Sequence, residues 1–166
     1  MARQLVGGPR SGGSTITQQL SRTLFIVDFH KTVRRKAVEI LLAFWLNRAK
    51  SKVEQLDLYL GSVRFDRGVI GLPKALQHFL GSVDKPISPA TAFFLVERVA
   101  NVRSQFLAAR IEQTIRRAVE ESFLDRSDVV ELLEIYQDQI SSGRIRDAEK
   151  GFRVVKSRIL EHLGSP

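Results

Sequence analysis

The sequence has no cysteine among its 166 residues, which excludes a disulfide scaffold, a thiol nucleophile and a thiolate metal site. Long hydrophobic runs are also missing: the longest unbroken apolar stretch, Ile40–Leu46, is far shorter than the roughly 20 residues that span a bilayer. Residues 1–9 lack the apolar stretch of a signal peptide. We therefore expect this chain to carry no export signal and no membrane anchor. Its length and its 43% hydrophobic and 27% charged residues are typical of about one folded domain.

Acidic residues are scarce in the first third of the chain. The formal net charge is +8, and residues 1–50 hold nine Lys or Arg against two acidic residues. Residues 51–166 hold seventeen against sixteen and are nearly neutral. This distribution predicts an anionic partner for the first third, such as a phosphate group, an acidic membrane surface or nucleic acid. A solvated basic face is the simpler alternative.

Strand signals are nearly absent, whereas helical signals follow one another along the chain. Helices are expected to start at capping residues: Ser14 or Thr15, with Gln18 completing a capping box, Thr32, Ser51 and Ser88. Further helices are expected over 73–81, 104–124, 127–142 with Ser127 as its cap, and 145–163. The glycine-containing segment 61–71 is expected to be a loop. The predicted fold class is all-α, with about seven helices.

The segment 12–20, Gly-Gly-Ser-Thr-Ile-Thr-Gln-Gln-Leu, is the first candidate binding site. At 100° per residue, one helix face is polar and the opposite one apolar. The polar face holds Ser14, Thr17, Gln18, Ser21 and Arg22, and the apolar face holds Ile16, Leu20, Leu24 and Val27. That polar face begins at a helix N-terminus, where free N–H groups favour anions. From the residues alone, the segment is a phosphate or sugar site, or simply a well-capped amphipathic helix.

A second unusual segment is Ala37–Leu46, in which Glu39 is the only polar residue among ten. A helix that is apolar on nearly every side is expected to be buried. Arg35 and Lys36 lie one turn before Glu39, so its carboxylate is expected at the boundary between a core and a basic surface. Two interpretations stay open: a structural ion pair within the helix, and a carboxylate held in a cleft beside cations for a phosphorylated ligand.

The apolar positions of the third and seventh expected helices predict packing faces. In the helix that starts at Ser51 they are Val53, Leu56, Leu60 and Val63. In the helix over 127–142 they are Val129, Leu133, Tyr136 and Ile140. The three histidines, His30, His78 and His162, are scattered and form neither a metal-ligand spacing nor a convincing Ser-His-Asp set.

The order and spacing of three segments resemble the peptidoglycan glycosyltransferases. These segments are 12–20, Arg35-Lys36-x-x-Glu39, and Ser51-Lys52 leading to Leu-Asp-Leu-Tyr-Leu at 56–60. This family comprises the transglycosylase domain of bifunctional penicillin-binding proteins and their monofunctional relatives. The likeness covers about residues 8–105, including Ile87-Ser88-Pro89-Ala90. On this interpretation, residues 1–105 form a glycosyltransferase-like domain and 106–166 a helical C-terminal extension packed on it.

The resemblance implies a lysozyme-like helical domain at the outer face of the bacterial cytoplasmic membrane. It implies polymerisation of lipid II: a sugar hydroxyl of the acceptor attacks the anomeric carbon of the growing chain with inversion, and undecaprenyl pyrophosphate leaves. That reaction requires a general base and stabilisation of the charge on the pyrophosphate. The implied partners are lipid II, the growing glycan chain and the membrane surface, with no nucleic acid.

The resemblance also implies roles for individual residues. Glu39 matches the family's second catalytic carboxylate, near the donor pyrophosphate, and Arg22 stands where the family usually has a lysine. The implied substrate-binding residues are Ser14, Thr15, Gln18, Gln19, Arg22, Lys31, Arg35 and Lys36. No residue is assigned as a metal ligand, and a divalent cation, Mg or Mn, is a candidate companion of the pyrophosphate.

One departure from the family pattern concerns catalysis directly. The family's first motif, Glu-Asp-x-x-Phe-x-x-His-x-Gly, carries its general-base glutamate, and none of the thirteen residues before Ser14 is acidic. The chain is therefore interpreted either as an N-terminally incomplete domain or as a degenerate member. Because general-base catalysis contributes typically about 10²–10⁴-fold, we expect little or no polymerase activity from these 166 residues.

Two other functions are weighed against the glycosyltransferase. The first is a non-catalytic relative that binds a lipid pyrophosphate or an anionic membrane surface through the basic first third. The second is a nucleic-acid-binding helical protein, suggested by a pI near 10.3. The second is weaker because the basic third contains an apolar helix and no helix with side chains suited to reading base edges.

Overall fold

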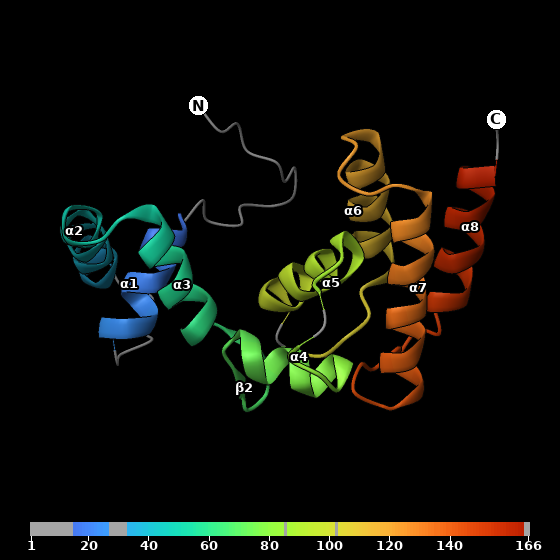
Figure 1. Cartoon of the computed structure of the whole chain (residues 1–166), viewed down its shortest axis with the longest axis horizontal. Coiled ribbons are helices and arrows are strands. Elements are labelled where there is room, and N and C mark those ends of the chain that lie inside the picture. The colour runs from blue at the N-terminus through green and yellow to red at the C-terminus, as the bar shows by residue number, and fades with distance from the viewer. Residues whose placement is uncertain (1–14, 27–32, 85, 102, 165–166) are drawn as a thin grey trace. The chain divides into compact units, whose positions relative to one another are not determined.

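The computed structural model describes residues 15–26, 33–84, 86–101 and 103–164, and it divides the chain into two compact units (Figure 1). Unit 1 is Met1–Val63 and unit 2 is Arg64–Pro166. The described residues contain eight helices and one two-stranded sheet. The predicted all-α class is therefore confirmed, and each of these eight helices overlaps a segment where a helix was expected. The predicted domain boundary after residue 105 stays a prediction.

Unit 1 contains three helices among its described residues: α1 (Ile16–Phe25), α2 (Val33–Ala49) and α3 (Lys52–Ser62). Thr15 caps α1, because its hydroxyl accepts a hydrogen bond from the backbone N–H of Gln18 at 3.2 Å. The expected capping box does not form, since the Gln18 side chain accepts instead from Lys36. At α3 both bonds of the Ser51–Glu54 capping box are present, as predicted.

The interior of unit 1 is partly polar. Its buried apolar side chains include Leu20 and Tyr59, but Thr17 and Gln55 are buried beside them. The Thr17 hydroxyl on α1 donates to Gln55 Oε1 on α3 at 2.8 Å, which satisfies both groups away from water. Because α1 contacts both α2 and α3, its polar residues form part of the interface between the helices.

Two expectations about burial in unit 1 are wrong. Helix α2 is not buried all round: among its described residues only Glu39, Ala43 and Leu46 are buried, along one stripe. On α3, Val53 and Leu56 of the expected apolar stripe are exposed, and the buried face runs through Gln55 and Tyr59. Three helices cannot cover every apolar side chain, and periodicity alone does not tell which face meets a neighbour.

Unit 2 begins with a hairpin in which β1 (Arg64–Asp66) pairs antiparallel with β2 (Val69–Ile70). Gly68 has φ +74° in its turn, a conformation that favours glycine. The expectation of a loop over 61–71 is thus wrong for these strands, which are too short to show an alternating pattern. The five helices that follow are α4 (Leu72–Leu80), α5 (Pro89–Ala100), α6 (Ala108–Glu120), α7 (Arg126–Ser141) and α8 (Phe152–Gly164).

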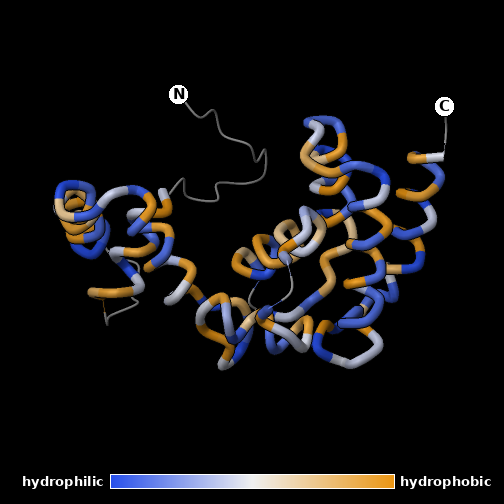
Figure 2. The backbone as a smooth tube through the Cα atoms, in the orientation of Figure 1, coloured by the Kyte–Doolittle hydropathy of each residue, from blue (hydrophilic) through white to orange (hydrophobic). Residues whose placement is uncertain are grey.

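A chain of aromatic rings runs through the core of unit 2. Phe79, Phe94, Tyr136, Phe106 and Phe152 meet in edge-to-face pairs whose ring centroids lie 5.2–5.4 Å apart. These rings belong to α4, α5, α7, the segment before α6, and α8, and hydrophobic residues recur on each of these elements (Figure 2). The predicted packing face of α7 is confirmed where Val129, Leu133 and Tyr136 are buried.

The starts of three helices differ from expectation. Asp125 caps α7 in place of Ser127 and forms a capping box with Asp128. A carboxylate at that position interacts more favourably with the helix dipole than a hydroxyl does. Helices α6 and α8 begin later than residues 104 and 145, because backbone bonds join the two segments that precede them: Arg146 N donates to Ser104 O and Phe106 N donates to Arg146 O.

Candidate functional site

Glu39 is the centre of the candidate site in unit 1. Its side chain is 1% exposed, and it pairs with two cations from the preceding turn of α2. Lys36 Nζ lies 3.1 Å from Glu39 Oε2, and Arg35 Nε lies 3.6 Å from Glu39 Oε1. The i, i+3 and i, i+4 spacings place all three side chains on one helix face, as predicted.

Lys36 connects this cluster to α1. Its ammonium group donates to Glu39 Oε2 and also to Gln18 Oε1, at 3.3 Å. Lys36 therefore joins the segment Arg35-Lys36-x-x-Glu39 to the segment 12–20. Glu39 Oε1 is buried and receives no hydrogen bond from the described part of the chain. A buried carboxylate oxygen with this unfilled acceptor capacity can take a donor from a ligand.

Gln19 and Arg22 belong to a different contact of α1. The Tyr59 hydroxyl on α3 donates to Gln19 Oε1 at 2.9 Å. Burial raises the pKa of Tyr59, and the positive charge of nearby Arg22 opposes that rise. Gln18 therefore meets α2 while Gln19 meets α3.

The structure thus joins some of the predicted site residues and separates others. Gln18, Arg35, Lys36 and Glu39 form one connected cluster. Thr15 acts as the cap of α1, and Gln19 and Arg22 lie by Tyr59. Ser14 and Lys31 lie outside the described residues. The functional roles of all these residues remain predictions.

A polar network at the junction of α2 and α3 was not anticipated. Lys52 donates to Asn47 Oδ1 and to the Thr17 hydroxyl, and Gln55 Nε2 also donates to Asn47 Oδ1. The motif Ser51-Lys52 carried the family resemblance, but nothing in the spacing placed Lys52 against α1. This network holds a further cation within unit 1.

A hydroxyl, a carboxylate and an imidazole also meet in unit 2, but their order is not that of a catalytic triad. The Ser104 hydroxyl donates to Asp66 Oδ1, and His78 Nε2 lies 3.8 Å from Asp66 Oδ2. In a triad the imidazole lies between the hydroxyl and the carboxylate and activates the hydroxyl. Here the Asp66 carboxylate lies between the hydroxyl and the imidazole. This cluster links β1 to α4 and to the segment after α5.

Among the described residues, no group of three or more His, Asp or Glu side chains is arranged to hold a metal ion. Over the same residues, no helix is both long enough and apolar enough to cross a membrane.

Comparison with known proteins identifies the family. The model of the family described as transglycosylase matches residues 1–130, well over half of the chain. The chain therefore belongs to the transglycosylase family, whose fold is lysozyme-like and helical, in agreement with the all-α structure.

Several curated proteins are similar to part of the chain. The biosynthetic peptidoglycan transglycosylase of Nitrosomonas europaea is 36% identical over 93 residues, which are 56% of this chain and 38% of that protein. Penicillin-binding protein 1F of Bacillus subtilis is 38% identical over 84 residues, 51% of this chain and 12% of that protein. A biosynthetic peptidoglycan transglycosylase of Burkholderia thailandensis is 42% identical over 69 residues, 42% of this chain and 27% of that protein. The matches thus span well under half the length of these relatives.

Proposed function

We propose that the chain is a peptidoglycan glycosyltransferase domain that binds lipid II through the Gln18–Lys36–Glu39 cluster and has low turnover within these 166 residues. The family match and the names of the relatives support the activity. The observation that carries the proposal is Lys36, which donates to Gln18 of the first motif and to buried Glu39 of the second. Residues from two separate motifs thereby surround one cation.

The cluster suits the departure of a pyrophosphate. In the proposed reaction, the acceptor hydroxyl oxygen bonds to the anomeric carbon while the bond from that carbon to the pyrophosphate oxygen breaks. Negative charge then grows on the pyrophosphate, and fixed cations nearby lower the barrier. Glu39 orients Arg35 and Lys36 for this task, and its Oε1 accepts a donor from the substrate.

The proposed reaction must also remove the proton of the acceptor hydroxyl. The general-base motif of the family is not among its residues, so proton removal lacks its usual acceptor. Positioning and charge stabilisation without a base give binding with slow turnover.

A divalent cation does not obtain a ligand set from this cluster alone. Glu39 is its single carboxylate and already faces Arg35 and Lys36. Magnesium is commonly bound by one or two carboxylates together with substrate phosphates and water. A Mg or Mn ion in the proposed complex would therefore take most of its ligands from the pyrophosphate and water, and no step above depends on it.

An exposed apolar stripe on α2 supports contact with a membrane. Ile40, Leu41, Phe44 and Trp45 are each at least half exposed. The Arg48 guanidinium lies over the Phe44 ring, 4.6 Å from its centroid. An apolar helix face flanked by cations is typical of a helix that lies in a membrane interface. This stripe would bring the cluster close to a lipid-linked substrate.

Lipid II binding and polymerisation in detergent test the proposal. We expect the chain to bind lipid II and to polymerise it slowly or not at all. Lys36→Gln removes the cation shared by Gln18 and Glu39, so binding is expected to weaken about tenfold. Glu39→Gln is expected to reduce any residual turnover.

Arg34→Gln provides the matched control, because Arg34 is exposed and lies next to the cluster on α2. It is expected to change binding by less than about twofold. Failure of the chain to bind lipid II, or equal binding by the Lys36 and Arg34 variants, contradicts the proposed site. Sustained polymerisation by the unaltered chain contradicts low turnover.

A further inference from the structure

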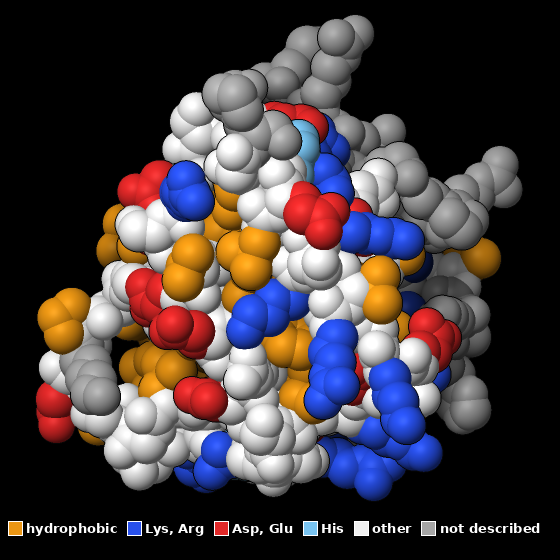
Figure 3. All heavy atoms as spheres, turned by 90° about the vertical axis from the view of Figure 1, so that its right-hand side faces the viewer, with side chains coloured by type: hydrophobic (Ala, Val, Ile, Leu, Met, Phe, Trp, Pro, Cys, Tyr) orange, Lys and Arg blue, Asp and Glu red, His pale blue; other side chains and the backbone are white. Residues whose placement is uncertain are grey.

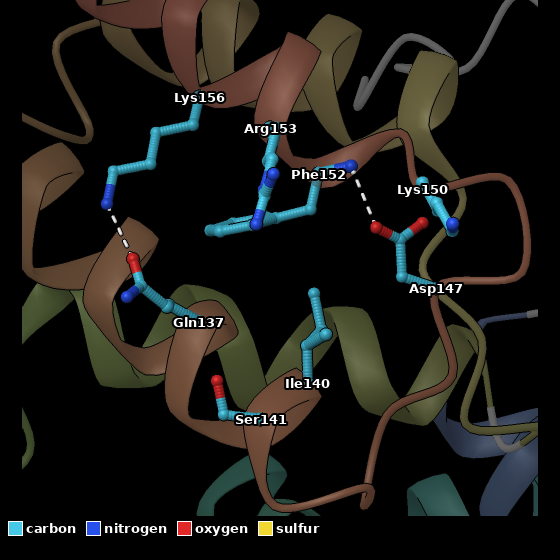
Figure 4. A pocket seen from close by; sticks show the side chains of 8 residues that line it. All are labelled: Gln137, Ile140, Ser141, Asp147, Lys150, Phe152, Arg153 and Lys156. Carbon is cyan, nitrogen blue, oxygen red and sulfur yellow. Dashed lines mark hydrogen bonds between the residues drawn. The ribbon is translucent and has the colours of Figure 1, made fainter.

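Unit 2 has a surface hollow of about 710 Å³ between the second half of α7 and the start of α8 (Figure 4). Ligand sites commonly have volumes of about 300–1,000 Å³, so the hollow is large enough for a small molecule or a headgroup. It shares no residue with the Glu39 cluster. Its lining comes from α7, the segment between the two helices, and the first turns of α8.

Three cations line this hollow: Lys150, Arg153 and Lys156. Their spacing of three residues places Arg153 and Lys156 about one helical turn apart on α8. In the described part of the chain, none of the three forms an ion pair with a carboxylate. In Figure 4 the side chain of Lys156 reaches from α8 to Gln137 on α7.

Among the described residues that line the hollow, the only acidic one, Asp147, is already engaged. Asp147 Oδ1 accepts from the backbone N–H of Gly151 at 2.9 Å, and Asp147 Oδ2 accepts from that of Phe152 at 3.0 Å (Figure 4). Both carboxylate oxygens therefore hold the start of α8 and do not bind a lysine or arginine. The charge of the hollow is left predominantly positive.

Two arginines at the contact between α6 and α8 are paired with a carboxylate, in contrast to these three cations. Arg158, also on α8, lies 3.5 Å from Glu112 Oε2, and Arg116 pairs with the same carboxylate at 2.9 Å. The contact between α6 and α8 therefore supplies a carboxylate to its arginines, whereas the three cations of the hollow have no carboxylate partner among the described residues. On the face of the molecule in Figure 3, Lys and Arg side chains gather toward the lower right, whereas acidic ones are scattered.

Apolar and uncharged polar side chains also line the hollow. Phe152 is 6% exposed, and Lys156 Nζ lies 5.9 Å from its ring centroid. Lys156 also donates to Gln137 Oε1 at 2.6 Å, which holds its ammonium group across the hollow toward α7. The cation is thereby positioned without being neutralised.

We propose that this hollow binds a phosphate-bearing anion, which Lys150, Arg153 and Lys156 hold by charge-assisted hydrogen bonds. Three positive charges that line one hollow match a group with two or more negative charges better than they match a single carboxylate. The guanidinium of Arg153 suits the bidentate geometry of phosphate oxygens. The same chemistry is offered by a soluble diphosphate and by the headgroup of an anionic phospholipid.

Two titrations of the whole chain, followed by amide NMR, distinguish these sources. The first uses inorganic pyrophosphate, and the second uses phosphatidylcholine vesicles with and without phosphatidylglycerol. A soluble ligand is indicated by saturable shifts of amides in the segment 147–156 on addition of pyrophosphate. A headgroup is indicated if only the phosphatidylglycerol vesicles give a response that depends on the hollow.

The variant K150N/R153Q/K156Q removes the three charges, and asparagine suits position 150, where φ is +50°. We expect it to weaken the response about tenfold or more. The control K74Q/R110Q/R126Q removes three charges from exposed positions of unit 2 outside the hollow and is expected to retain the response. The absence of any response in 147–156, or equal weakening by both variants, overturns the proposal.

Discussion

Glu39 shows how much of a site can be inferred from spacing at the scale of single residues. Its pairing with Arg35 and Lys36 follows from their positions on one helix and was predicted. The bond from Lys36 to Gln18 was not predicted, because it depends on how α1 meets α2. The two interpretations of Glu39 that the sequence left open, a structural ion pair and a carboxylate beside cations for a ligand, are compatible. An ion pair within a helix can at the same time hold cations toward a substrate.

The Glu54 carboxylate at the start of α3 gives a prediction about acid titration. Its hydrogen bond from Lys50, followed by the bonds from Ser51, lowers the pKa of Glu54 from 4.5 to about 2. A folded-state pKa below the unfolded one means that this group stabilises the fold above pH 4.5 and loses that effect as the pH falls through about 2. NMR titration of the Glu54 carboxyl carbon is expected to show an ionised group well below pH 4.5.

Lys50→Gln tests the cause of that shift, because it removes the largest contribution. We expect the Glu54 midpoint to rise toward 4.5 in this variant and to stay unchanged in Lys74→Gln, which alters an exposed lysine of unit 2. A midpoint near 4.5 in the unaltered chain would refute the explanation by hydrogen bonds from Lys50 and Ser51.

At the scale of elements, sequence patterns predicted the positions of helices better than they predicted which helix faces are buried. Ser51, Ser88 and Gly81 mark helix ends as predicted, because capping depends on a few adjacent residues. The burial of α2 was predicted wrongly, because its composition says that it is apolar but not how many neighbours cover it. The late start of α8 depends on a backbone pairing between distant segments, which no local pattern reveals.

The exposed stripe of α2 allows a test of the proposed contact with a membrane. In a vesicle flotation assay with anionic vesicles, L41Q/F44Q is expected to reduce the bound fraction about tenfold or more, because both side chains would leave water on binding. The control V53Q/L56Q removes apolar side chains of α3 that are likewise exposed, and it is expected to bind as the unaltered chain does. Equal loss by both variants would show that the stripe has no special role.

Gly151, just before α8, is a position where an added methyl group is expected to reduce the stability of unit 2. A Cβ at Gly151 would lie 2.7 Å from the Ala108 Cβ of α6, so the two segments must separate. We expect Gly151→Ala to reduce the free energy of unfolding of unit 2 by about 1–3 kcal/mol, measured by urea denaturation. Gly164→Ala, which meets no atom within 4 Å, is expected to change it by less than about 0.5 kcal/mol.

At the scale of the whole molecule, the division after Val63 predicts independent folding of unit 2. The contacting rings of its aromatic core run from Phe79 to Phe152 and, within the described part of the chain, include none from unit 1. We expect a fragment of residues 64–166 to give a cooperative thermal transition by far-UV circular dichroism. A fragment of 106–166 lacks Phe79 and Phe94 and is expected to melt without cooperativity. The reverse result would place the structural boundary near residue 105.

The exposed aromatic pair on unit 1 has a practical consequence. Trp45, the single tryptophan of the chain, is 56% exposed, and its ring meets Phe25 edge to face with centroids 6.1 Å apart. The single indole fluorophore of the chain therefore lies on the surface that is proposed to contact lipid. Any event that removes water from this indole will shift its emission to the blue, so docking can be timed by stopped-flow optics without attaching a dye.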